Sequence, residues 1–136
     1  MEDIDRLRKI EQIICEIKDL SRAGAVIIVE GKKDRDALNE LGISDQILLA
    51  SSPPLLNFAE DISRKTNQVI ILTDWDSQGE KMAKKISAYL QASGSKPNNL
   101  IRKKIKKLVR KESKDVEGLS GYVNNLRREV YTRHYP

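Results

Sequence analysis

Three short apolar runs limit the folds open to this 136-residue chain more than any other feature. They cover residues 25–29, 46–50 and 68–73 and are rich in isoleucine, valine and leucine. Apolar runs without polar alternation are typical of strands that are buried on both faces of a parallel sheet. Helical patterns separate and follow the runs, so we predict an α/β fold with a parallel sheet of three to four strands flanked by helices.

Apolar side chains that recur every three or four residues predict the helices. The first has about twenty residues starting near Ile4, and we expect its Cys15 to be a small buried residue. No clear strand pattern follows Gly94, where a basic helical pattern stands instead. The later helices are expected at about residues 34–41, 55–65, 77–91, 100–109 and 116–128.

The composition excludes several classes of protein. A single cysteine and a single histidine, His134, rule out a disulfide scaffold, a Cys/His zinc finger and a Ser-His-Asp hydrolase with its histidine near the core. The longest apolar run, residues 25–29, is far shorter than the roughly 20 residues of a membrane span. No leader pattern stands at the N-terminus. We therefore expect a cytoplasmic protein with no membrane partner.

The net charge of +5 is unevenly distributed along the chain. Residues 1–94 hold 13 basic and 16 acidic side chains, whereas residues 95–136 hold 12 basic and 4 acidic ones. An acidic body therefore carries a basic C-terminal segment. Such a segment indicates a polyanionic partner, although a lysine-rich helix face is also commonly plain solvated surface.

Acidic residues follow two of the apolar runs. Glu30 comes directly after the first run, and Asp74 and Asp76 follow the third. If those two strands are neighbours, the three carboxylates meet at one edge of the sheet, where ligands of parallel α/β proteins bind. Repulsion would raise their pKa values unless a hard cation, Mg²⁺ or Mn²⁺, neutralised them. Taken singly, Asp34 and Asp76 also fit helix N-caps, and residues 77–80 fit a capping box.

The two acidic segments together resemble the signatures of the Toprim domain. Glu30-Gly31-Lys32-Lys33-Asp34 looks like its Glu-Gly-x-x-Asp pattern, and residues 74–79 look like its Asp-x-Asp-x-x-Gly pattern. The domain occurs in topoisomerases, bacterial-type primases, several nucleases and the ribonuclease that matures 5S ribosomal RNA. The chain is most similar to small stand-alone Toprim proteins, including near its end at residues 114–119. The resemblance implies a Rossmann-like fold over about residues 24–120.

The resemblance also implies roles for the matching residues. Glu30 would act as general acid or base, or as a metal ligand, and Asp74 and Asp76 would hold Mg²⁺. Asp34 would support the site or cap a helix. Apart from the resemblance, the missing side chains of Gly31 and Gly79 would let a phosphate or another part of a ligand approach the backbone closely. Phosphate contacts are expected from exposed cations: Lys32, Lys33, Arg102, Lys103, Lys106, Lys107 and Arg110.

We therefore predict a small Toprim protein that binds Mg²⁺ and acts on phosphodiester bonds of RNA or DNA, as an RNA-processing endonuclease. Two alternatives stay open: a non-catalytic module that binds nucleic acid or protein, and a primase-like nucleotidyl transferase. The expected organisation is an N-terminal helix (1–23) packed on the domain (24–120), followed by a C-terminal helix and tail (121–136). The N-terminal helix either packs on the sheet alone or also binds a second copy or another protein.

Overall fold

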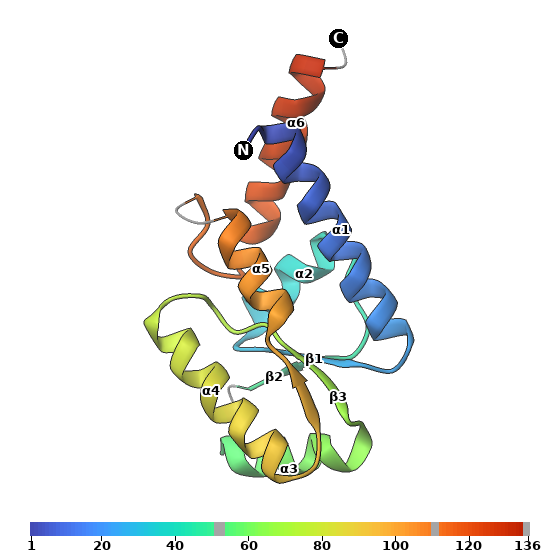
Figure 1. Ribbon diagram of the computed structural model, residues 1–136, viewed down its shortest axis with the longest axis vertical. Helices are drawn as coiled ribbons and strands as arrows, with labels where there is room; N and C mark the ends of the chain where they lie inside the picture. Colours follow the sequence, from blue (N-terminus) through green and yellow to red (C-terminus); the bar gives the residue numbers. More distant parts are fainter. Residues whose placement is uncertain (51–53, 110–111, 135–136) are drawn as a thin grey trace.

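Strands β1 (Val26–Val29) and β3 (Gln68–Ile71) form the centre of a four-stranded parallel sheet in the computed structural model, which describes residues 1–50, 54–109 and 112–134 (Figure 1). β2 (Ile47–Leu49) pairs with β1, and β4 (Lys96–Asn98) pairs with β3. The strand order is thus β2-β1-β3-β4, which confirms the predicted α/β fold with a parallel sheet. The order reverses between β1 and β3, so the carboxyl ends of these two strands flank the crevice where such sheets bind ligands.

Side chains of the central strands alternate between two apolar cores. Val26 and Ile28 pack with α3 (Leu55–Lys65) and α4 (Ser77–Ala92) on one face of the sheet. Ile27 and Val29 belong to the core on the other face. The central strands are therefore buried on both faces, which explains why these runs show no polar alternation. The helices of the second core are α1 (Asp3–Arg22), α2 (Lys32–Glu40), α5 (Leu100–Val109) and α6 (Leu119–His134).

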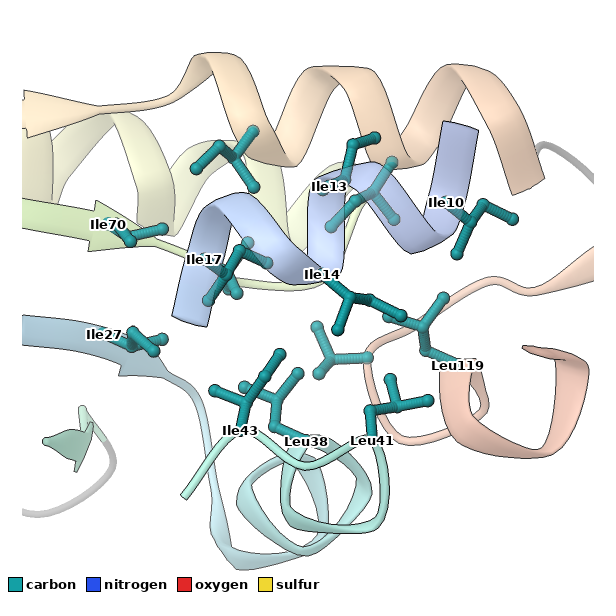
Figure 2. Packing of buried hydrophobic residues seen from close by; sticks show 14 of the residues in the cluster. Ile10, Ile13, Ile14, Ile17, Ile27, Leu38, Leu41, Ile43, Ile70 and Leu119 are labelled. Atoms are coloured by element: carbon teal, nitrogen blue, oxygen red, sulfur yellow. The ribbon is translucent and has the colours of Figure 1, made fainter. Parts of the chain in front are cut away.

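Helix α1 is the centre of the second core. One face of α1 presents Ile10, Ile13, Ile14 and Ile17, which fill the space between α5 and the apolar side chains of α2 and α6 (Figure 2). α1 and α6 lie side by side and extend away from the sheet toward both chain ends (Figure 1). An ion pair of 2.7 Å between Arg127 of α6 and Glu11 of α1 also links the two helices.

The structure corrects three sequence-based expectations. A fourth strand does follow Gly94: β4 has three residues, includes Pro97 and pairs on one side only, so it lacks the apolar signal of a central strand. Cys15 is exposed rather than buried, because it lies off the apolar stripe of α1. The last helix begins at Leu119 instead of near Val116, and residues 113–118 form a turn segment before it.

No helix in the described part of the chain is long and apolar enough to cross a membrane.

Candidate functional site

The ends of β1 and β3 bring two acidic residues together. Glu30 directly follows β1, and Asp74 lies three residues after the end of β3. The Oε2 atom of Glu30 accepts a hydrogen bond of 2.8 Å from the backbone N–H of Asp74. Both side chains are half-buried at the sheet edge where the strand order reverses. We refer to residues 73–76, which lie between β3 and α4 and include Asp74, as the Asp74 loop.

Gly79 lets the first turn of α4 pack directly against the Asp74 loop. A Cβ atom at Gly79 would lie 1.7 Å from the carbonyl oxygen of Asp74, which no side chain could tolerate. The buried Thr73 hydroxyl fixes the same contact by donating a hydrogen bond of 2.8 Å to the carbonyl of Gly79. At Gly79, the group that approaches closely is therefore the Asp74 carbonyl of the protein itself, instead of the expected ligand. At Gly31, in contrast, an added Cβ would meet no atom within 4 Å.

The segment 113–118 holds the Asp74 loop from the other side. The N–H of Val116 donates a hydrogen bond of 2.9 Å to Oδ1 of Asp74, and Val116 itself is buried. The indole N–H of Trp75 donates a bond of 2.7 Å to the carbonyl of Ser113. Trp75 is 6% exposed, so it packs behind the site instead of offering a stacking surface. Residues 114–119 were identified from the sequence only by their similarity to small stand-alone Toprim proteins, and no role in the site was predicted for them.

The site concentrates negative charge. Burial raises the pKa of Glu30 to about 7, and the neighbouring carboxyl groups of Asp74 and Asp34 add to the effect. Asp34 is itself buried, which raises its pKa, and Asp74, Glu117 and Asp115 raise it further. Its Oδ2 atom accepts a hydrogen bond of 3.0 Å from the N–H of Gly31 at the start of α2.

Asp76 is placed differently from Glu30 and Asp74. Its side chain is exposed, and its Oδ1 atom accepts a bond of 2.7 Å from the N–H of Gly79, so it caps α4. The capping box expected at residues 77–80 is not present, because Asp76 is the N-cap and Glu80 forms ion pairs with Arg102 and Lys106. Among the residues that the structure describes, the second carboxylate oxygen of Asp76 has no hydrogen-bond partner.

The donor atoms at this edge suit a hard divalent cation. Within residues 1–50, 54–109 and 112–134, Oε1 of Glu30 and Oδ2 of Asp74 accept no hydrogen bond from an N–H group, and the two carboxyl groups lie close enough to interact with each other. In the same part of the chain, no three acidic, histidine or cysteine side chains converge into a complete cation site. Mg²⁺ commonly binds through one or two carboxylates and completes its shell with water and substrate phosphate oxygens. The carboxylates present fit that mode of binding.

The basic residues divide into an exposed group and one buried exception. Lys32 and Lys33 are exposed at the start of α2, and Lys33 Nζ lies 3.9 Å from Glu117. α5 exposes Lys103, Lys106 and Lys107, whereas Arg110 lies outside the described residues. The expectation for Arg102 is wrong: its side chain is 1% exposed and bonds to the Asp74 loop, so it is not available to a nucleic acid.

Comparisons with known proteins agree with the fold. The model of the Toprim domain family matches residues 25–113, which leaves α1 and α6 outside the match. The chain is 48% identical over 122 residues to a UPF0292 protein of Methanosarcina barkeri, covering 90% of this chain and 85% of that protein. A UPF0292 protein of Thermococcus sibiricus is 33% identical over 86% of this chain and 90% of its own length. A solved structure from Aquifex aeolicus has a TM-score of 0.69 and 30% identity, covering 79% of this chain and 94% of that one.

The two glycines of the site predict opposite responses to alanine. Gly79→Ala should destabilise the protein by about 1–3 kcal/mol or more, because the added methyl group must displace the Asp74 carbonyl. Gly31→Ala is the matched control, since its backbone is extended and the methyl group meets open space. Urea unfolding measures both changes. Equal stability of the two variants would contradict the described contact between α4 and the Asp74 loop.

Glu30→Gln should stabilise the protein in EDTA, and increasingly so as the pH rises. The pKa of Glu30 is higher in the folded protein than its ordinary value of 4.5, so folding is opposed as the carboxyl group ionises. Near pH 4.5 the two proteins should differ little. Above about pH 8 the variant should be more stable by on the order of 1–2 kcal/mol. Urea unfolding at several pH values tests this, and a difference independent of pH would contradict the raised pKa.

Proposed function

The chain belongs to the Toprim domain family, and from this we propose that it is a Mg²⁺-dependent endonuclease that cleaves phosphodiester bonds in RNA. One observation carries the proposal: Glu30 and Asp74 are hydrogen-bonded neighbours at the sheet edge where the strand order reverses. A structural pair with no other role would not need its carboxylates half-exposed and crowded by Asp34. Crowded carboxylates lower the stability of the folded protein, and a site that binds a cation and a phosphate would explain why they are kept together.

The chemistry assigns separate roles to the acidic residues. Asp74 and the second carboxylate oxygen of Asp76 would hold the cation, which would stabilise negative charge on the non-bridging phosphate oxygens. Glu30 either accepts a proton from the attacking water, as a general base, or donates one to the leaving oxygen, as a general acid. Its pKa of about 7 describes the site without a cation, and a bound cation would lower this pKa toward the ionised form that a general base requires. Asp34 keeps the entry to α2 fixed through the N–H of Gly31.

The outer row of α5, formed by Lys103 and Lys106, is the proposed path for the nucleic acid backbone. Lys106 lies 3.4 Å from Glu80, which belongs to the first turn of α4 just beyond the Asp74 loop. This row is therefore adjacent to the acidic edge. Lys104 faces the other way and lies 3.8 Å from Glu16 of α1. Lysine contacts to phosphates give binding that depends on salt and reads little sequence, which leaves specificity to the shape of the RNA.

A cleavage assay with matched variants tests the proposed reaction. The purified protein with millimolar Mg²⁺ should cleave structured RNA, and EDTA should abolish the reaction. Glu30→Gln and Asp74→Asn should each lower the rate by about 100-fold or more, since each removes a group that acts on the reacting atoms. Asp61→Asn, an exposed acid on α3, is the control and should cleave normally.

The same assay separates the alternatives. If the wild-type protein and both variants are equally inert on RNA and DNA, the proposed nuclease activity is wrong. A non-catalytic binding module has one observation in its favour, because Asp76 is already used as a helix cap. That module would bind RNA in a salt-dependent manner without cleavage. Incorporation of labelled nucleotide would instead indicate the transferase.

Removing the outer row of α5 should weaken RNA binding and its dependence on salt. In the double variant Lys103→Gln, Lys106→Gln, the slope of log affinity against log salt should fall by about 2, one unit for each lost phosphate contact. The double variant Arg64→Gln, Lys65→Gln removes two exposed cations from α3, on the opposite face of the sheet, and should keep the wild-type slope. Titration by fluorescence anisotropy measures both. Equal slopes for all three proteins would exclude this row as the path.

A further inference from the structure

Arg102 is a buried cation that serves the Asp74 loop. It comes from α5, and its side chain is 1% exposed. Its Nε atom donates a hydrogen bond of 2.9 Å to the carbonyl of Thr73, and one terminal nitrogen donates to the carbonyl of Asp74. The other terminal nitrogen pairs with Glu80 at 2.7 Å. One guanidinium group thus binds three acceptors, two of them in consecutive residues of the loop.

Stability alone does not account for a charged residue in this position. Burying a guanidinium group carries a large desolvation cost, and a protein with an apolar side chain of similar volume in its place is often as stable or more so. Its one carboxylate partner, Glu80, is 34% exposed and is shared with Lys106. Ion pairs that are open to solvent in this way recover only part of the cost.

The geometry of the three bonds fixes the orientation of Asp74. The planar fork of Arg102 holds the carbonyls of Thr73 and Asp74 from behind the loop. With both carbonyls fixed, the N–H of Asp74 points to Glu30 and its carboxylate meets the N–H of Val116. A lysine carries the same charge but lacks the rigid fork, so it cannot hold both carbonyls and Glu80 in one fixed arrangement.

We propose that Arg102 is a positioning residue: it holds the backbone of the Asp74 loop so that Asp74 presents its carboxylate to a divalent cation. The inference rests on the proposed function for the identity of the ligand. The arrangement of the Asp74 loop does not depend on the proposed function, because the loop has this arrangement before any cation binds. Arg102 touches neither the cation nor the RNA and acts only through Asp74.

The test compares Arg102→Met, Arg102→Lys and a matched control, Arg127→Met. Arg127 also binds a carboxylate through two nitrogens, at 2.7 and 3.1 Å from Glu11, but it lies between α1 and α6. Two readouts are independent of catalysis. Calorimetry measures the affinity for Mg²⁺, and acrylamide quenching measures the accessibility of Trp75 in EDTA. Trp75 is the only tryptophan of the chain and lies within the loop.

Both readouts should change in the Arg102 variants. Arg102→Met should bind Mg²⁺ at least tenfold more weakly than the wild type, and its Trp75 should be quenched more strongly. Arg102→Lys should lie between the two, because charge without the fork restores the site only in part. Arg127→Met should keep the wild-type affinity and quenching even if its melting temperature falls.

Three results would overturn the proposal. The first is a folded Arg102→Met with wild-type Mg²⁺ affinity and quenching. The second is an equal loss of affinity in Arg127→Met, which would indicate a general effect of destabilisation. If Arg102→Met does not fold, Arg102→Lys replaces it as the test. The third result that would overturn the proposal is then wild-type Mg²⁺ affinity and wild-type quenching in Arg102→Lys. If the wild-type protein binds no Mg²⁺, the proposed function fails separately, and quenching of Trp75 alone decides the role of Arg102.

Discussion

The hydrogen bond from the N–H of Asp74 to the carboxylate of Glu30 is the interaction on which the site depends. It joins the ends of β1 and β3, two strands that are adjacent in the sheet but far apart in the sequence. The bond places a second acidic side chain beside a carboxyl group whose burial already raises its pKa. The fold thus maintains a concentration of negative charge that only a cation or a proton can relieve.

Elements distant in the sequence hold this arrangement in place. α5 contributes Arg102 to the back of the Asp74 loop, and the segment 113–118 contributes the N–H of Val116. Both elements pack in the core that α1 and α6 complete. The Toprim match ends at residue 113, so part of the support for the acidic edge comes from outside the matched region. The turn segment that follows the matched region therefore holds Asp74 directly.

The sequence was sufficient to predict the central strands, because buried parallel strands are continuous apolar runs. It predicted that Glu30, Asp74 and Asp76 meet only if the first and third strands are neighbours, and the structure pairs these strands and joins Glu30 to Asp74. The sequence pattern could not separate Arg102 from the exposed lysines. Arg102 borders the apolar stripe of α5, and only the tertiary contact with the loop decides that it turns inward. The sequence pattern also did not predict β4, because its three residues, a lysine, a proline and an asparagine at the edge of the sheet, give no periodic apolar signal. The partnership of Val116 with Asp74 spans 42 residues and has no local signature.

The central claim is that the acidic edge between β1 and β3 binds a divalent cation through Asp74. A crystal structure of the protein soaked in Mn²⁺, with anomalous diffraction data, tests it most directly. The account predicts an anomalous peak about 2.2 Å from a carboxylate oxygen of Asp74, with the remaining ligands drawn from neighbouring acids and water. The peak should be absent in Asp74→Asn. A peak located away from Asp74, or none at millimolar Mn²⁺, would contradict the account.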